Sequence, residues 1–585
     1  MVKGLLVLLL AIGLHLPKEQ VGVPVLAGSR IVEVNRPQGK VFGNGQRNPK
    51  PVLMQFEKGA AGELVLRPAG YRSPHGMEWR EHGRHRHEPA RFPILEETEG
   101  AYLIDISDYF STYPEPLSAI PPKVLHGRAL THEILTAQEE DRYLQVTGRY
   151  RYASGLVVTA ACYFIFLPET PMPIRSVDPQ KAGYNSVEFR HPQHRLVQVS
   201  QRWDLRGGRV IDFYVDKAFP QEWYPFIKEG IEDWNRAFEA IGLGKVISVH
   251  PEPEDGSLDR NAPLVNMVRY MDIEESNAKG DVLYDPRSGE IIQGDILWWK
   301  NVLGKLLDWR YLQTGAADPR ARLHEAPIDL VGPMIRYSIC HEMGHVLGLC
   351  HNMGASWAYP SDSLRSPSFT KKYGTAASVM DYARFNHLAT AADLAEGVSL
   401  LPPRLGPYDY YAIACGYGAD EPAPGPYCRF APFYSAAISP DPSAQAESLG
   451  DDLLRSSSAG LDNCRALLRL DGLDEARTVR LRRQYYRYVM LALSNIGGKV
   501  DGIPVDRKVQ KETVRFVMSA LSEVPPELSD PGQQQRILDE LVGNFLPERI
   551  VASGGKKALK SYYRQLRKYR KQLPLKNEKD WLFNN

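Results

Sequence analysis

The sequence predicts a multidomain α+β protein, with a β-rich N-terminal domain, a mixed α/β middle domain and a helical C-terminal region. The chain has 585 residues, enough for about three to four domains. Near residue 205 the hydrophobic pattern changes from strand-like alternation to a mixture of strand and helix periods. A segment rich in Pro, Ser, Gly and Asp at 418–462 precedes the last helices. We therefore place domains at 28–205 and 206–415, followed by a linker and helical region at 416–585.

The first residues form a candidate secretory signal. Lys3 precedes an apolar run at 4–14, which is too short for a membrane helix of about 20 residues. Cleavage is best placed after Ala27, so we predict a signal peptide at 1–27 and export to the periplasm or secretion. The alternative is that the run is the buried first strand of a cytosolic protein.

The overall composition excludes several classes of protein. With 43% hydrophobic and 24% charged residues, the chain is of ordinary globular type rather than collagen-like or wholly disordered. Lys and Arg number 71 and Asp and Glu 70, so the net charge of +1 lacks the basic excess of a dedicated nucleic-acid binder. No later stretch is long and apolar enough to span a bilayer. We therefore expect neither a nucleic-acid partner nor a transmembrane segment.

Six cysteines in a chain of this length cannot be the main support of the fold. Export would nevertheless permit disulfides. Cys415 and Cys428 bracket a short loop rich in Pro and Gly, and they are the pair most expected to be bonded. The remaining four are expected to be small buried hydrophobic side chains: Cys162, Cys340, Cys350 and Cys464.

The β-rich character of the N-terminal domain rests on two expected hairpins. In the first, strands at 51–56 and 63–67 are joined by a turn that contains two glycines. In the second, strands at 143–152 and 156–166 are joined by an Ala-Ser-Gly turn. A break with two consecutive glycines near residue 207 then marks the domain boundary.

The middle domain is expected to combine strands with an amphipathic helix. Strands are predicted at 210–215, 245–249, 264–270 and 291–299. The helix predicted at 223–241 carries apolar residues at spacings of three, one and four, which place them on one face. Beyond the linker, the pattern predicts helices at 465–495 and 508–521.

The most informative stretch runs from His341 to His351 and fits the pattern H-E-x-x-H-x-x-G-x-x-H. On a helix, His341 and His345 are four residues apart and project from one face, a spacing that suits two nitrogen ligands of one Zn²⁺. Gly348 can end the helix, because glycine tolerates the left-handed conformation of such a turn. The turn would bring His351 back as a third ligand. Three protein ligands leave a fourth position for water, which is typical of a catalytic zinc site.

Glu342 follows the first histidine directly. It is poorly placed to bind the metal but well placed to hold a water molecule beside it. A zinc ion lowers the pKa of that water to about 7, and the carboxylate can accept its proton. Glu342 would then pass the proton to the departing amine of a protein or peptide substrate. The predicted activity is therefore that of a zinc-dependent endopeptidase.

Three other interpretations of the motif are open. The histidines could simply pack in a core, but burying three together without a shared partner is costly. The enzyme could hydrolyse a non-protein amide. Alternatively, the protein could be a catalytically silent, zinc-stabilised binding protein, although such a protein would not need Glu342.

The motif, together with Ser378-Val379-Met380-Asp381-Tyr382, resembles the metzincin zinc peptidases. The similarity is greater still to a group of bacterial zinc-dependent metalloproteases, and it extends over about residues 210–415. The segments that carry it include 233–238, 285–290, 332–337, 351–356, 362–366, 380–386 and 405–409. The pattern is intact at each zinc ligand and at the base.

The resemblance implies a metzincin-like catalytic domain with a twisted mixed sheet and long helices behind an active-site cleft. It implies that Met380 lies in a Met-turn beneath the zinc. It further implies that the Tyr382 hydroxyl binds the metal or assists the oxyanion; a buried tyrosine bonded locally is the alternative. In such enzymes an edge strand pairs with extended substrate, and 292–299 is the candidate here; the alternative is that it is a plain strand of the sheet. No clear cysteine-switch propeptide is present.

Overall fold

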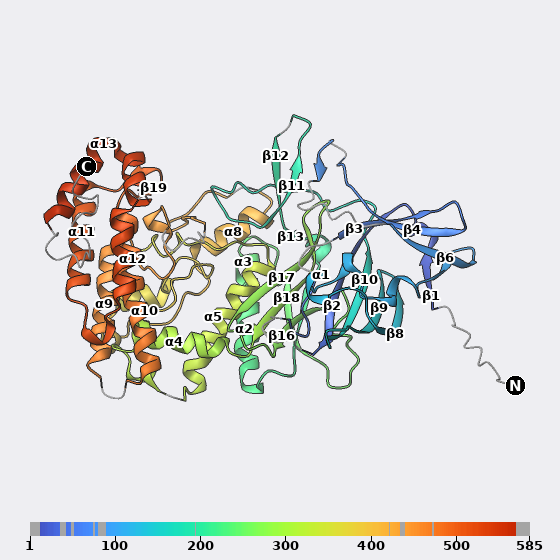
Figure 1. The fold of residues 1–585 in the computed structure, drawn as a ribbon, viewed down its shortest axis with the longest axis horizontal. Helices are drawn as coiled ribbons and strands as arrows, with labels where there is room; N and C mark the ends of the chain where they lie inside the picture. Colours follow the sequence, from blue (N-terminus) through green and yellow to red (C-terminus); the bar gives the residue numbers. More distant parts are fainter. Residues whose placement is uncertain are drawn as a thin grey trace.

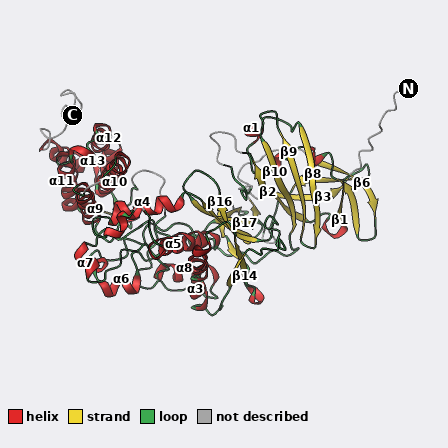
Figure 2. Cartoon of the chain, turned by 90° about the horizontal axis from the view of Figure 1, so that it is seen from below, coloured by secondary structure: helices red, strands yellow, loops and turns green. Residues whose placement is uncertain are grey.

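The structure, a computed structural model, describes residues 12–35, 42–47, 52–73, 76–79, 89–193, 195–323, 325–420, 422–432, 439–470, 473–543 and 545–568. Along its length, β-sheets at the N-terminal end are followed by a mixed α/β region and then by packed helices at the C-terminal end (Figures 1 and 2). The predicted multidomain α+β fold is therefore confirmed.

The N-terminal region is built around one large sheet. Within the described residues, nine strands pair antiparallel in the order β1-β7-β6-β4-β3-β2-β10-β9-β8. The strands are β1 (Gly13–Pro17), β2 (Pro24–Val34), β3 (Val52–Lys58), β4 (Glu63–Pro68), β6 (Ala90–Glu97), β7 (Ala101–Asp105), β8 (Thr131–Glu140), β9 (Tyr143–Arg151) and β10 (Val157–Phe166). A short helix, α1 (Pro122–Leu125), precedes β8. Both predicted hairpins are present, as β3–β4 and β9–β10.

The described part of the predicted signal peptide belongs to this sheet. Val25, Leu26 and Ala27 are buried in β2, which pairs with both β10 and β3. Cleavage after Ala27 would remove β1 and divide β2. The alternative interpretation concerned the apolar run at 4–14, of whose described residues Leu14 is buried in β1. Residues 1–11 lie outside the described residues, and the signal peptide stays a prediction. In the described part of the chain, no helix has the length and apolar character needed to cross a membrane.

The middle region contains a small sheet and the sheet that carries the candidate site. The small sheet has the order β12-β11-β5, from β5 (Glu78–Trp79), β11 (Ser186–Arg190) and β12 (Leu196–Ser200). The second sheet has the order β13-β18-β16-β14-β15, with β17 beside β18. Its strands are β13 (Arg202–Trp203), β14 (Ile211–Val215), β15 (Ile247–Pro251), β16 (Asn266–Met271), β17 (Ala278–Asp285) and β18 (Glu290–Trp299). All its pairs are parallel except β17–β18, so the sheet is mixed as expected.

The expectation that 292–299 forms the substrate-pairing edge strand is wrong. This segment lies within β18, which pairs with β13, β16 and β17. The turn at 286–289 joins β17 to β18 as an antiparallel pair. β17, rather than β18, takes the position beside the candidate site. The sequence did not indicate β17, because Lys279, Gly280 and Asp281 lack the apolar alternation of a strand.

Helices pack around this sheet and form the C-terminal region. Those of the middle region are α2 (Tyr224–Glu232), α3 (Asn235–Glu239), α4 (Val302–Thr314), α5 (Ile328–Val346), α6 (Pro367–Tyr373), α7 (Ala391–Ala395) and α8 (Pro407–Tyr417). Those of the C-terminal region are α9 (Leu453–Leu468), α10 (Glu475–Ala492), α11 (Arg507–Ser522), α12 (Pro531–Val542) and α13 (Phe545–Lys568), with a short hairpin of β19 (Lys499–Val500) and β20 (Ile503–Pro504). The helix predicted at 223–241 is divided into α2 and α3, and that at 465–495 into α9 and α10, whereas α11 matches its prediction.

The expected disulfide between Cys415 and Cys428 is not formed. The Cys415 side chain is buried in the core of the middle region. The Cys428 thiol instead approaches the carbonyl oxygen of Pro407, at 3.5 Å. The two ends of the loop are therefore held by packing rather than by a covalent bond.

Candidate metal centre

Helix α5 runs through the core of the middle region and contains the first two histidines of the motif. Its inward side chains are almost entirely buried, including Met334, Ile335, Ile339, Met343 and Val346. Indole N–H groups fix the helix from two sides: Trp234 donates to the carbonyl of Cys340 and Trp203 to that of Val346, each at 2.9 Å. Side chains projecting from this helix therefore have little positional freedom.

The helix ends where the sequence predicts. Gly348 has a φ of +96°, and a Cβ at this position would overlap the backbone carbonyl of Gln201. Only glycine can therefore take this position without displacing the neighbouring chain. The turn returns His351 to the histidine face of α5. The structure thus brings His341, His345 and His351 together, as the motif predicted.

The three imidazoles form a cluster that could hold a metal ion, because one nitrogen of each lies within 4.8 Å of those of the other two. His341 Nδ1 lies 2.7 Å from the carbonyl oxygen of Val379, and His345 Nδ1 lies 2.8 Å from that of Leu349. These contacts assign the proton to Nδ1 in both rings and leave Nε2 with a lone pair. The Nε2 atoms of His345 and His351 are 3.1 Å apart. Such neutral, convergent nitrogens are the donor set that zinc prefers.

Electrostatics favour the same neutral state. Burial lowers the pKa of His341 well below its usual value, with a further contribution from the neighbouring imidazoles. Burial, and then the proximity of His345 and Arg384, lower the pKa of His351 to about 3. A histidine must be deprotonated at the coordinating nitrogen to bind a metal. The cluster is therefore ready to bind a divalent cation at neutral pH.

Glu342 lies between α5 and β17, and its side chain is only slightly exposed. The backbone N–H of Gly280 donates to Glu342 Oε2 at 2.8 Å. Burial raises the pKa of this carboxyl to about 7, although the Gly280 hydrogen bond and the charges of Arg384 and Lys279 act in the opposite direction. A carboxyl with a pKa in this range can both accept and release a proton near neutral pH.

A tight turn after α6 passes beneath the histidines and contains Met380, as the resemblance implied. A Cβ at Gly344 would overlap the Met380 sulfur, so the Met380 side chain lies directly against α5. The buried Asp409 carboxylate holds the turn, because it accepts from Ser378 Oγ at 2.6 Å and from the Val379 N–H at 2.8 Å. The role of Asp409 was not foreseen, although 405–409 lies in the segment that carried the resemblance.

Tyr382 lies beside the cluster. Its ring centroid is 4.5 Å from that of His351 and 5.4 Å from that of His341. Burial raises its pKa to about 12, so the hydroxyl keeps its proton and can donate a hydrogen bond at neutral pH. The guanidinium of Arg384 also lies over this ring, with Cζ 4.1 Å from the Tyr382 ring centroid. Nothing in the sequence indicated Arg384 beyond its place in the similar segment 380–386.

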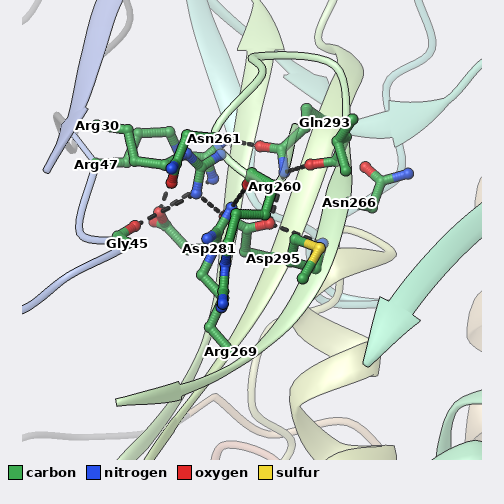
Figure 3. Close-up of polar contacts among 12 residues, drawn as sticks. Arg30, Gly45, Arg47, Arg260, Asn261, Asn266, Arg269, Asp281, Gln293 and Asp295 are labelled. Atoms are coloured by element: carbon green, nitrogen blue, oxygen red, sulfur yellow. Dashed lines mark hydrogen bonds and ion pairs between the residues drawn. The ribbon is translucent and has the colours of Figure 1, made fainter. Parts of the chain in front are cut away.

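Buried charges connect the N-terminal region to the strand beside Glu342 (Figure 3). Arg47 donates from Nε and Nη2 to Asp281 on β17, at 3.1 and 3.0 Å. Asp295 on β18 pairs with Arg30 of β2 and with Arg269 of β16, the latter at 3.2 Å. Arg30 and Asp295 have no exposed side-chain surface. Since Asp281 follows Gly280 directly, an ion pair from the N-terminal region supports the strand that contacts the candidate base.

A large cavity lies elsewhere in the middle region. It has a volume of about 870 Å³ and is lined in part by Phe226, Asp233, Arg336, Cys340 and Tyr410. Its lining includes neither the three histidines nor Glu342. It therefore adjoins a different face of α5 and does not contribute to the candidate metal centre.

Comparison with known proteins agrees with this geometry. Residues 324–571 match the model of a family described as Met-zincin. This part of the chain is therefore similar to a Met-zincin domain. The match extends beyond the expected middle domain and includes most of the helical C-terminal region. No curated protein and no solved structure gave a significant match. The family and the histidine cluster together support a zinc metalloprotease in general.

Proposed function

We propose that the protein is a zinc-dependent endopeptidase with His341, His345 and His351 as metal ligands. The observation that carries this proposal is the convergence of three neutral imidazoles beside a buried carboxylate on the same helix. A purely structural zinc site would normally have a fourth protein ligand. Holding α5 against β17 does not require an ionisable group at Glu342, since a neutral amide could accept the same hydrogen bond from Gly280.

A zinc ion held by these histidines would supply a Lewis acid and lower the pKa of a water molecule to about 7. Glu342 accepts the proton of that water as it attacks the substrate carbonyl. The Gly280 hydrogen bond keeps the Glu342 carboxylate oriented during this step. Glu342 then returns the proton to the departing amine. The Tyr382 hydroxyl donates to the oxyanion that develops on the substrate carbonyl.

We propose β17 as the strand that pairs with extended substrate. Among the described strands, β17 pairs with β18 alone, which leaves its other edge available for main-chain hydrogen bonds apart from the Gly280 N–H, which donates to Glu342. This edge lies beside α5, since a Cβ at Gly280 would lie 2.8 Å from that of His345. A peptide added here would pass next to the metal centre.

The substitution Glu342→Gln tests the mechanism. The variant should keep one zinc per chain, measured by mass spectrometry of the metal, while casein hydrolysis falls about 10²- to 10⁴-fold. His345→Ala should lose both zinc and hydrolysis. Glu396→Gln, at an exposed position directly after α7, serves as a matched control. Unchanged hydrolysis by Glu342→Gln would refute the assigned base.

The same assay separates the alternative functions. A hydrolase of non-protein amides would cleave small amides but not denatured protein. A catalytically silent binding protein would hold zinc and cleave neither. Cleavage of casein that is abolished by a chelator and restored by zinc supports the endopeptidase.

We also propose that the protein is exported. The sheet would stay intact if a signal were cleaved before β1 or were not cleaved. Amino-terminal sequencing of the periplasmic or secreted protein tests this, and a mature chain that begins after Ala27 would require β1 and the first four residues of β2 to be dispensable.

A further inference from the structure

Arg384 occupies an unusual position beside the metal centre. Its guanidinium lies between two aromatic rings, with Cζ 3.7 Å from the ring centroid of Trp309 on α4 and 4.1 Å from that of Tyr382. The Tyr382 ring in turn contacts the ring of His351. A single aromatic ring therefore contacts both this cation and a candidate zinc ligand.

The backbone of Arg384 is held in place from both sides. Its φ is +64°, a conformation that is strained for a residue with a side chain. On one side, the Phe385 N–H donates to the buried Gln313 side chain at 2.9 Å. On the other, the Glu447 N–H donates to the carbonyl of Tyr382 at 2.9 Å. Strained residues that the surroundings fix in this way are concentrated at functional sites.

Arg384 also lacks an acidic partner. It forms no ion pair with any residue that the structure describes, and its Nε is buried without a hydrogen bond. The nearby Glu447 carboxylate accepts from Gln484 instead, at 3.2 Å. A second cation, Lys305, lies over the same Trp309 ring at 4.9 Å.

This arrangement places a cation without a direct ion pair next to a site for a divalent cation. Burial raises the pKa values of the nearby carboxyls, Glu342 and Asp381, and they feel the charge of Arg384 only as an opposing influence that lowers those pKa values. Partly desolvated charges without a counter-ion are costly, and a bound zinc ion would add to the repulsion. An anion that binds here would relieve both costs. A planar guanidinium already fixed by stacking is well suited to hold a carboxylate through two parallel hydrogen bonds.

We propose that Arg384 is a specificity-determining residue that binds a carboxylate of the peptide substrate. The carboxylate is either the substrate's C-terminal group or an acidic side chain close to the scissile bond. This inference rests on the proposed peptidase function, and it adds the chemical class of substrate that the site prefers.

The test measures binding rather than turnover. Zinc-loaded Glu342→Gln protein is titrated by calorimetry with three acetylated tripeptides of matched length. The first has neutral side chains and a free C-terminal carboxylate, the second has the same sequence with a C-terminal amide, and the third is an amide with a central glutamate. We expect at least one carboxylate peptide to bind about tenfold or more tightly than the neutral amide, and the comparison of the first and third peptides identifies the source of the carboxylate.

Substitutions in the same background assign the preference to Arg384. Arg384→Gln should abolish the preference for carboxylate peptides. Arg384→Lys should retain part of the preference, because lysine keeps the charge but lacks the planar guanidinium. Lys305→Met, which removes the other cation over Trp309, should leave the preference intact. Circular dichroism and zinc content confirm that each variant is folded and loaded.

Equal affinity for the three peptides, binding of none of them, or a preference that persists in Arg384→Gln would overturn the inference. Casein hydrolysis by the unmodified protein is measured separately. Hydrolysis without a carboxylate preference contradicts this inference alone, whereas a carboxylate preference without any hydrolysis contradicts the proposed peptidase function.

Discussion

The backbone N–H of Gly280 donates to Glu342 Oε2 at 2.8 Å, which joins a sheet strand directly to the candidate base. Gly280 lies on β17 and Glu342 on α5, so the position of the carboxylate depends on how closely these two elements pack. The neighbouring residue, Asp281, is bonded to Arg47 from the N-terminal region. The candidate base is therefore positioned by residues from two regions of the chain.

Gly280→Ala should impair catalysis without removing zinc. The new Cβ would lie 2.5 Å from the carbonyl oxygen of Glu342 and 2.8 Å from the Cβ of His345, so β17 must move away from α5. A displacement of about 1 Å can lower the rate about a hundredfold, because the base loses its orientation. Casein hydrolysis and zinc content are measured on the same preparation. Gly70→Ala, where no atom lies within 4 Å of the new Cβ, is the control, and wild-type activity in Gly280→Ala would contradict the assigned contact.

Arg47→Met should lower peptidase activity, although Arg47 does not contact the candidate base directly. Arg47 bonds Asp281 and Gln293, and its removal leaves the largely buried Asp281 carboxylate beside Gly280 with the exposed Lys279 as its remaining ion-pair partner. Breaking a buried ion pair costs about 3–5 kcal/mol, and part of this cost would appear as displacement of β17. We expect kcat to fall by about tenfold or more, with zinc content unchanged.

Two further variants distinguish this effect from a general loss of stability. Arg47→Lys should recover part of the activity, because it keeps the charge that faces Asp281. Arg72→Met removes an ion pair with Glu78 in which both side chains are largely exposed, and it should have almost no effect. Full activity in Arg47→Met would show that the N-terminal region does not support the candidate base.

Acid should weaken the link between the N-terminal and middle regions. Burial opposes ionisation of Asp295, but the charges of Arg30, Arg269 and Arg47 outweigh it and lower the pKa of Asp295 below its ordinary value. A carboxyl with a lowered pKa stabilises the fold at every pH above its unfolded pKa of about 4. This contribution is lost progressively as the pH falls below about 4 towards the folded pKa.

The substitution Asp295→Asn tests this stabilisation. At pH 7 the variant should lose about 3–5 kcal/mol of stability, since Arg30 and Arg269 remain buried without their partner. Thermal unfolding between pH 7 and pH 3 should show a smaller acid-induced decrease for the variant than for the wild type. Asp329→Asn, at an exposed ion pair with Arg320, should follow the wild-type curve. Parallel curves for Asp295→Asn and the wild type would contradict the assignment.

The sequence predicted those features that local spacing determines. His341 and His345 must share a helix face if the segment is helical, and Gly348 must end that helix if His351 is to return. Features that depend on distant pairing were not predictable. Arg30 and Asp295 are separated by 265 positions, and nothing in the segment around either residue points to the other. The role proposed for Arg384 depends on its contact with the ring of Trp309 on helix α4, which the local sequence does not indicate.

The incorrect predictions have similar causes. The segment 292–299 was correctly predicted as a strand, but its place in the sheet depends on β17. The polar residues of β17 lack the apolar alternation from which a strand is predicted. The proposed pairing of Cys415 with Cys428 followed from loop length alone, which carries no information on where each thiol packs. The cleavage site after Ala27, by contrast, stays a prediction, because residues 25–27 are apolar and small enough for such a site and equally suited to a buried strand. In each case the local pattern was compatible with two structures that differ only in tertiary contacts.

Gly344→Ala should separate the role of the Met-turn from that of the zinc ligands. Gly344 is the position at which α5 contacts the Met380 sulfur, and its Cβ would also lie 2.9 Å from the buried Trp234 ring. Because Trp234 is fixed by its hydrogen bond to α5, the added methyl group must displace the Met380 turn, and overpacking of this kind costs about 1–3 kcal/mol. The turn also holds His341 through the carbonyl of Val379, so its displacement should weaken zinc binding as well. We expect about a 10- to 100-fold loss of zinc affinity in competition with a chelator. Gly304→Ala, at an open position of α4, should leave zinc affinity unchanged, and equal zinc affinity in Gly344→Ala would mean that the Met-turn does not position the ligands.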